Sequence, residues 1–244
     1  YDGLKPTGVG IGQLSKSPIR SLHLGGLPIS DEGLAEMAGF SDLEHLGLEN
    51  AKITDAGIKV IAGLKKLRSF HVHNTGITAA GLTALKSCPI TNLGIGRTAS
   101  ELAVQAADLA LIFPKLTTLQ MPRDCLPTPD DWNAIAASFP KLERISFDSQ
   151  PFKDEHLQGL EAFPALEELN LHYAKLTDAG VIALSKLKKL DWLHLYEAQI
   201  TDASLEVLAG MKSLKRVKLP QPGKGITADG LAKFKKQRPD MKVE

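Results

Sequence analysis

One six-residue pattern recurs along almost the whole chain and constrains its fold more than any other feature. In this pattern the first, fourth and sixth residues are apolar, and it occurs nine times at steps of 23 to 26 residues. A unit of this length cannot bury its own apolar face, so regular repetition predicts a solenoid in which neighbouring units stack. The nine matches start at Ile19, Leu43, Leu67, Ile90, Leu116, Leu142, Leu166, Leu190 and Leu214.

The two ends of the chain fit the same repeat. The segment from Gly10 to Ile19 parallels the segment from Gly81 to Ile90, and Met241 and Val243 resemble the start of a further strand. No linker or change of composition separates the repeats. We therefore predict a single domain over residues 1–244, with nine full repeats and a partial repeat at each end.

Each repeat has two halves with different periodicity. The first half alternates, as in Leu46-Gly47-Leu48, which predicts a short strand with its apolar residues facing inward. The second half begins with a box such as Ile53-Thr54-Asp55-Ala56-Gly57-Ile58. Its threonine is placed to cap a helix, its aspartate suits the helix dipole, and its flanking isoleucines have the spacing of a hydrophobic staple. Each repeat is thus predicted to be a strand, a turn and a helix.

The strand pattern L-x-x-L-x-L, followed by a helix start of the type I-T-D-A-G-L, resembles the leucine-rich repeat proteins. The closest subtype in pattern is the bacterial, ribonuclease-inhibitor-like and GALA-like one, and the resemblance covers about residues 6–243. It implies an α/β fold, a right-handed solenoid or horseshoe with a parallel concave sheet and convex helices. It also implies a non-catalytic scaffold that binds a protein partner on the concave sheet. The absence of cysteine-rich caps fits a bacterial protein.

Repeats four and five depart from the pattern because they lack the box. Residues 98–114 indicate a longer apolar helix, and the segment from Leu126 to Trp132 indicates a helix that starts at a proline. Thr128 and Asp131 keep the spacing of a capping box. Three explanations remain open: tolerated drift of the repeat, a change of curvature, or a specialised convex surface.

The variable strand positions of repeats six to eight predict where a partner binds. Trp192, His194 and Tyr196 alternate on one strand and should share its outward face, beside His172 of the preceding repeat. Exposed aromatic residues are favoured in binding hot spots, although cross-strand packing that only stabilises the sheet would select the same residues. The predicted partner site comprises Glu168, His172, Tyr173, Trp192, His194, Tyr196 and Arg216, with Asp148 and Asp191 near its edge. The proline-rich turn that ends at Trp132 is the next candidate.

Three histidines near the other end of the sheet could in principle bind a metal. His45, His71 and His73 fall on neighbouring strands, with Glu49 close by, and such a set contains ligands that zinc accepts. Outward histidines on a polar sheet are nevertheless common without a metal. We expect no metal site and no cofactor.

Two outward glycines in repeat four, Gly94 and Gly96, predict a notch between bulkier neighbours. A side chain of the partner could enter such a notch. The alternative is that small residues here only relieve crowding within the sheet.

The charge of the chain argues against several classes of partner. It has 29 Lys and Arg against 28 Asp and Glu, and no apolar run reaches the length of a membrane span. Residues 211–244 are basic, with 10 Lys and Arg against 3 Asp and Glu, which we interpret as the polar end of the solenoid. We therefore expect neither a membrane, a nucleic acid nor a small molecule as the partner.

The sequence also indicates that the chain is not an enzyme. It contains no phosphate-binding glycine loop, nucleophile elbow or metalloprotease motif. Its two cysteines, Cys88 and Cys125, are two repeats apart and are not expected to form a disulfide. A second hypothesis is that the chain is the recognition module of a larger protein whose activity lies in another domain. The sequence does not indicate the cellular compartment.

Overall fold

The computed structural model describes residues 7–96, 99–121, 126–147, 152–223 and 225–244. The chain divides into two compact units. Unit 1 contains residues 1–97 and 104–122, and unit 2 contains residues 98–103 and 123–244. The single domain that the repeat predicts stays a prediction.

Each unit is a parallel sheet whose strands follow one another in chain order. The strands of unit 1 are β1 (Ser21–His23), β2 (His45–Gly47), β3 (Ser69–His71), β4 (Asn92–Gly94) and β5 (Thr118–Met121). Those of unit 2 are β6 (Arg144–Phe147), β7 (Glu168–Asn170), β8 (Trp192–His194), β9 (Arg216–Lys218) and β10 (Lys242–Val243). This alternation of strand and helix confirms the predicted α/β class and the repeated strand-and-helix unit.

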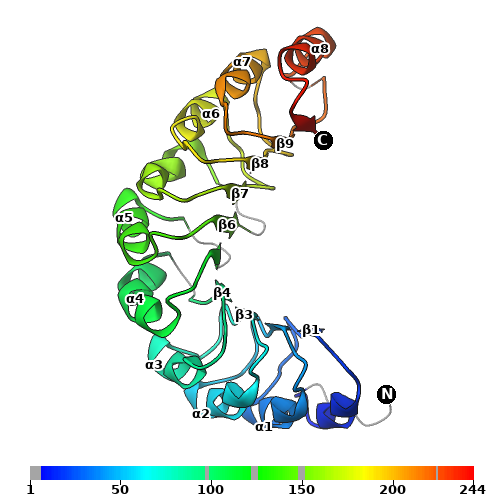
Figure 1. Cartoon of the computed structure of the whole chain (residues 1–244), viewed down its shortest axis with the longest axis vertical. Coiled ribbons are helices and arrows are strands. Elements are labelled where there is room, and N and C mark those ends of the chain that lie inside the picture. Colours follow the sequence, from blue (N-terminus) through cyan, green and yellow to red (C-terminus); the bar gives the residue numbers. More distant parts are fainter. Residues whose placement is uncertain (1–6, 97–98, 122–125, 148–151, 224) are drawn as a thin grey trace. The chain divides into compact units, whose positions relative to one another are not determined.

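Within each unit the helices lie on the side of the repeats opposite the strands (Figure 1). The α-helices are α1 (Asp31–Ala35), α2 (Asp55–Ile58), α3 (Ala79–Leu82), α4 (Ala99–Ile112), α5 (Pro129–Ser138), α6 (Asp178–Leu184), α7 (Asp202–Gly210) and α8 (Ala228–Gln237). The 3-10 helices are η1 (Ile11–Lys16), η2 (Glu36–Gly39), η3 (Lys59–Gly63), η4 (Thr83–Leu85), η5 (Asp154–Leu157) and η6 (Leu160–Ala162). No helix in the described ranges has both the length and the apolar character needed to cross a bilayer.

The register of the strands agrees with the repeat spacing. In unit 1, Ser21 of β1 lies opposite His45 of β2, and His45 lies opposite Ser69 of β3. In unit 2, Trp192 lies between Glu168 and Arg216 on the neighbouring strands. Residues at equivalent repeat positions therefore form columns across each sheet, as the sequence predicts.

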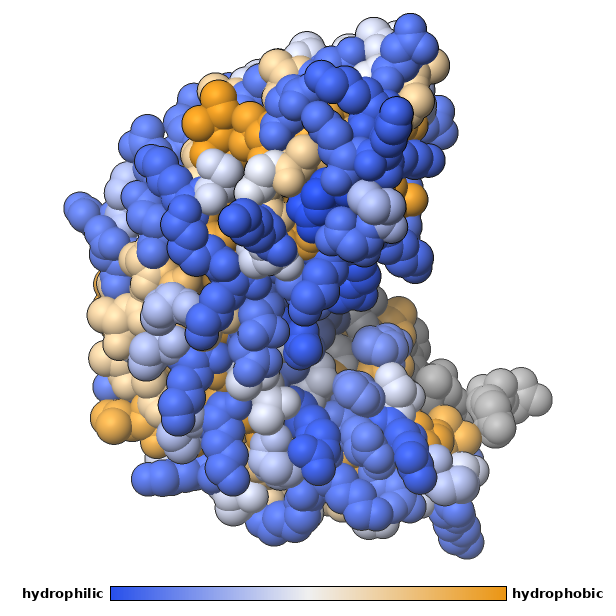
Figure 2. All heavy atoms as spheres, turned by 45° about the horizontal axis from the view of Figure 1, so that its top comes forward, coloured by the Kyte–Doolittle hydropathy of each residue, from blue (hydrophilic) through white to orange (hydrophobic). Residues whose placement is uncertain are grey.

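The apolar residues of the repeat form the core between strands and helices. Leu46 and Leu193, in the middle of their strands, are 1% and 0% exposed. The staple residues Ile53 and Ile58 are likewise buried on the helical side. Because the leucines face inward, hydrophilic side chains cover most of the face that Figure 2 shows.

The helical halves differ more between repeats than the sequence predicts. In repeats one to three a single turn of α-helix continues as a 3-10 helix, which is common where helices end. In repeat six the helix is replaced by η5 and η6, and Gly159 lies between them with φ of 97°. This left-handed conformation cannot continue an α-helix, so the repeat takes two short 3-10 segments instead.

The threonines of the box cap their helices, as predicted. Thr54 Oγ1 accepts a hydrogen bond from the Ala56 amide, and Thr201 Oγ1 accepts one from the Ala203 amide. In repeat five the predicted capping box is present: the Asp131 amide donates to Thr128 Oγ1, and the Thr128 amide donates to Asp131 Oδ2. Local sequence therefore sets where these helices begin.

The aspartate of the box also has a role that the repeat pattern does not reveal. Its carboxylate accepts two hydrogen bonds from the capping threonine of the next repeat, one from the amide and one from the hydroxyl. For Asp31 and Thr54 these bonds are 2.9 and 2.8 Å long. The same pair of bonds joins Asp55 to Thr78, Asp154 to Thr177, Asp178 to Thr201, and Asp202 to Thr227. We call this set the aspartate ladder.

The aspartate ladder also explains the glycine of the box. A Cβ atom on Gly57 would lie 2.8 Å from Cγ of Asp31, which is closer than two carbon atoms approach. Ser204 replaces this glycine in one repeat, and there its hydroxyl donates a hydrogen bond to Asp178. The position therefore takes either no side chain or one that bonds to the aspartate.

Repeats four and five interrupt the ladder. The interruption begins in the box of repeat three, where Ala79 occupies the position that is aspartate in the boxes at Asp31, Asp55, Asp178 and Asp202, and a methyl group cannot accept a hydrogen bond. The 14-residue helix α4 follows, as predicted, and exposes Val104 and Leu111 to solvent, at 83% and 74%. Within the proline-rich turn that was the alternative docking candidate, Trp132 is 0% exposed and not available to a partner, whereas Leu126 is 47% exposed. The ring of Trp132 belongs to the core of unit 2.

Candidate functional site

The aromatic and imidazole side chains that were predicted to share one face do gather on the sheet of unit 2. They come from β8 and from the turns that follow β7 and β8. The rings of His172, Tyr173, Trp192, His194 and Tyr196 form one group of contacts. We call these five residues the ring cluster.

Most rings in the cluster stack in parallel. The centroid of His172 lies 4.3 Å from that of Tyr173 and 4.7 Å from that of His194, with interplanar angles of 26° and 18°. Trp192 is parallel to His194 within 12°, at 6.4 Å. Tyr196 meets His172 edge-on at 5.4 Å. Stacked and edge-to-face pairs of this kind stabilise each other by about 0.5–1.5 kcal/mol, which holds the cluster in one arrangement.

Two cations from β9 complete the cluster. The guanidinium of Arg216 lies 4.6 Å from the centroid of the Trp192 ring, and Nζ of Lys218 lies 5.2 Å from that of the Tyr196 ring. Both distances are within the range of cation–π attraction. The predicted rim residue Arg216 therefore contacts the ring cluster directly.

The acidic rim residues are already paired with basic ones. Glu168 contacts Arg144 at 3.2 Å, and Asp191 lies 3.6 Å from Lys215 and 3.8 Å from Arg216. Burial raises the pKa of Glu168, and Arg144 opposes that effect. Asp148, which the sequence placed at this edge, lies outside the described residues.

His194 is more buried than its outward position suggests. It is 9% exposed because the neighbouring rings cover it, and its Nε2 atom has no hydrogen-bond partner among the described residues. Burial, with smaller effects from His172 and Lys218, lowers the pKa of His194 from 6.5 to about 4. His194 is thus a neutral ring that supports the cluster at neutral pH.

This burial predicts a loss of stability in mild acid. Between pH 6.5 and pH 4 the unfolded state takes up a proton on His194 that the folded state does not take up. The free energy of unfolding therefore decreases as the pH is lowered through this range. We expect His194 to account for roughly 2–3 kcal/mol of this fall. His194→Phe, which keeps a stacking ring but cannot titrate, should lose less stability between pH 7 and pH 4 in urea unfolding. Tyr196→Phe is the control in the same cluster, and equal losses in both variants would refute the low pKa.

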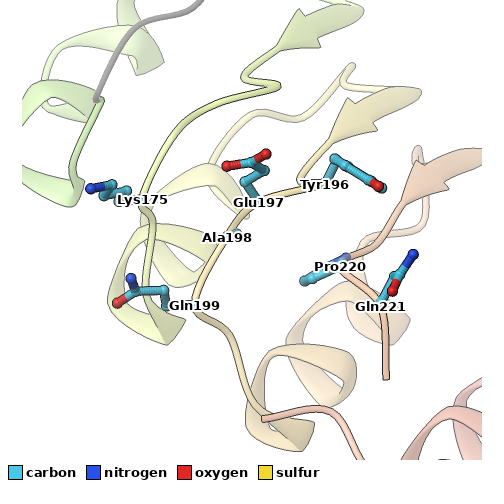
Figure 3. A pocket seen from close by; sticks show the side chains of 7 residues that line it. All are labelled: Lys175, Tyr196, Glu197, Ala198, Gln199, Pro220 and Gln221. Atoms are coloured by element: carbon cyan, nitrogen blue, oxygen red, sulfur yellow. The ribbon is translucent and has the colours of Figure 1, made fainter. Parts of the chain in front are cut away.

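A pocket of about 420 Å³ lies beside the ring cluster. It is lined by residues of the segments that follow β7, β8 and β9, namely Lys175, Tyr196, Glu197, Ala198, Gln199, Pro220 and Gln221. Figure 3 shows Tyr196, Pro220 and Gln221 on one side of this pocket and Lys175 and Gln199 on the other. Tyr196 therefore belongs both to the cluster and to the wall of the pocket.

Of the three histidines considered as metal ligands, His71 and His73 have protein partners. His71 lies 3.6 Å from Glu49 and bonds to Asn92 at 3.1 Å, while Nε2 of the buried His73 lies 2.8 Å from the Gln120 carbonyl oxygen. His45 is exposed. In the described part of the chain, no three His, Cys, Asp or Glu side chains are grouped so that they could hold a metal ion.

At Gly94, one of the two glycines of the predicted notch, the space is occupied by a side chain of the protein itself. A Cβ atom on Gly94 would lie 2.8 Å from Nε2 of His73, so the imidazole occupies the space that a side chain would need. The glycine thus relieves crowding in the sheet and leaves no room there for a partner's side chain. The repeat pattern does not connect His73 with Gly94, so the sequence alone does not predict this contact.

The structure describes one of the two cysteines, Cys88. Cys88 is free and buried, and burial raises the pKa of its thiol. Cys125 lies outside the described residues.

Comparison with known proteins supports the fold. Residues 164–185 match the family model described as Leucine Rich repeat. An internalin C2 from Listeria monocytogenes str. 4b F2365 is similar in structure, with a TM-score of 0.50 and 19% identity over 88% of this chain and 92% of that one. An internalin (inlF) from the same organism gives a TM-score of 0.35 and 15% identity over 95% of this chain and 88% of that one. A search of curated proteins finds no match.

Three observations agree: the matched repeat, the solved structure that shares the fold, and the parallel strands that recur about every 24 residues with helices on the opposite side. The chain has the leucine-rich repeat fold.

Proposed function

We propose that this chain is a non-catalytic scaffold that binds a protein partner on the sheet face of unit 2, at repeats six to eight. The observation that carries the proposal is the ring cluster. Tyr173 and Tyr196 are 44% and 36% exposed, and Trp192 is half-buried, on the sheet face opposite the described helices of unit 2 (Figure 1). Solenoids commonly use such an extended sheet face for binding, and aromatic side chains are enriched in binding hot spots.

Stacking within the cluster supports binding as well as sheet stability. Because each ring is held by its neighbours, a partner would not have to immobilise free side chains when it binds. The ion pairs of Glu168 and Asp191 surround the rings with charge. Apolar rings inside a charged rim are the usual anatomy of a protein-binding surface. This proposal applies equally to a free-standing scaffold and to the recognition module of a larger protein.

The first test removes single rings from the cluster. We expect Trp192→Ala and Tyr196→Ala each to weaken binding by about 2 kcal/mol or more, which is roughly 30-fold in Kd, because truncating a central aromatic residue removes most of its buried contact area. The partner would be found by affinity capture from the native organism, and the Kd measured by titration calorimetry with the purified pair.

Lys188→Ala is the matched control, since Lys188 is exposed and lies outside the ring cluster. It should bind like the unchanged protein. If the two aromatic variants are folded and also bind normally, the partner does not use this face.

A further inference from the structure

We propose that the ring cluster selects an acidic segment of its protein partner, whose Asp or Glu side chains meet Lys218 and Arg216. This inference rests on the proposed function and adds the chemistry of the partner. It is carried by two features of the cluster: which parts of the rings remain free, and which charges remain uncompensated.

Most of the ring faces are covered by contacts within the cluster or with the two cations of β9. His172 stacks with Tyr173 and His194, Arg216 covers the ring of Trp192, and Lys218 lies over the ring of Tyr196. A nucleobase needs an open ring face on which to stack, so this arrangement does not favour a nucleic acid. The ring edges are what remains for a partner, and edges carry partial positive charge that suits carboxylates.

The cations of β9 lack full compensation by carboxylates. Arg144 pairs with Glu168 at 3.2 Å, and Lys242 pairs with Glu244 at 2.6 Å. By contrast, no carboxylate in the described ranges lies within ion-pair distance of Lys218, which contacts the Tyr196 ring and attracts Glu244 only at longer range.

The charge of Arg216 is also only partly compensated by carboxylates. Arg216 shares Asp191 with Lys215, and the two contacts are long, at 3.8 and 3.6 Å. The net charge beside the rings is therefore positive, and a partner's carboxylate would be attracted to it.

The pocket beside Tyr196 offers a place for the next part of an extended segment. It opens at the end of β8, where Pro220 and Gln221 face it from the neighbouring segment (Figure 3). Glu197 and Lys175 line it together, so the pocket itself has no strong charge preference. We therefore place the acidic contact at Lys218 and Arg216, and an uncharged residue of the partner in the pocket.

The test is a selection of random displayed dodecapeptides on the immobilised full chain, followed by Kd measurements with the enriched peptides. Binding is compared in Trp192→Ala, Lys218→Gln and Arg216→Gln, with Lys188→Gln as the control for loss of a lysine elsewhere. We expect peptides that require Trp192, are rich in Asp and Glu, lose about tenfold affinity in Lys218→Gln and Arg216→Gln, and bind more weakly as salt rises. Lys218→Glu should shift the selection away from acidic peptides.

Two other outcomes overturn the inference in different ways. Peptides that require Trp192 but are not acidic, or that bind Lys218→Gln and Arg216→Gln normally, would refute the acidic partner and leave the binding face in place. Enriched peptides that bind Trp192→Ala normally, or a selection without any enrichment, would count against both the acidic partner and the proposed face. Normal circular dichroism spectra of all variants separate these results from loss of folding.

Discussion

Trp132→Ala is expected to lower the free energy of unfolding by about 3–5 kcal/mol, because it empties a large volume in the core of unit 2. Trp132 is fully buried, and its ring meets Phe147 and Phe163 edge-on at 5.8 and 5.7 Å. Its Nε1 also donates a hydrogen bond to the His156 carbonyl oxygen at 2.9 Å. The substitution would remove the packing and leave that carbonyl oxygen without its donor.

The other tryptophan provides the contrast. Trp192 lies on the sheet surface, so Trp192→Ala should lower the free energy of unfolding by about 1 kcal/mol or less. Urea unfolding followed by circular dichroism measures both variants on the same scale. If Trp132→Ala were as stable as Trp192→Ala, the placement of α5 against the core would be wrong.

The aspartate ladder gives the second large effect. We expect Asp178→Ala to lower the free energy of unfolding by about 3–4 kcal/mol, because three donors lose a charged acceptor at once. These donors are the amide and hydroxyl of Thr201 and the hydroxyl of Ser204, which is 0% exposed. Burial alone would raise the pKa of Asp178, but the hydrogen bonds from Ser204 and Thr201 outweigh it and hold the pKa below its usual value.

The lowered pKa of Asp178 determines how its contribution to stability changes with pH. A carboxylate with a lowered pKa contributes stability above its ordinary pKa of 3.8, and this contribution is lost as the pH falls through the lower, folded value. Asp178→Ala should therefore differ most from the unchanged protein at neutral pH and least in strong acid. Urea unfolding of Asp178→Ala and of the unchanged protein, at neutral pH and in strong acid, measures this difference.

Asp229→Ala is the matched control for the ladder. Asp229 also lies in the first turn of its helix, α8, and can interact with the helix dipole in the same way. The ladder bonds described above do not include it, so its removal should have a much smaller effect. Equal effects of the two substitutions would show that the dipole, and not the bond to the next repeat, is what the aspartate contributes.

The candidate site was partly predictable from the sequence. The spacing of about 24 residues places Trp192 beside Glu168 and Arg216, because equivalent positions of parallel strands become neighbours. The alternation along β8 places Trp192 and His194 on one face. The spacing does not reveal that His194 is covered by its neighbours, since burial depends on the side-chain conformations of three strands at once.

The sequence alone determined the repeat, the columns of the sheet and the starts of most helices, because these depend on periodicity and on bonds between residues a few positions apart. Only the tertiary structure showed that Asp31 bonds to Thr54, that His73 fills the space at Gly94, and that Trp132 lies in the core. Each of these is a contact between side chains and groups of different repeats. Such contacts depend on how closely the repeats stack and which rotamers then fit, and the repeat pattern contains no information on either.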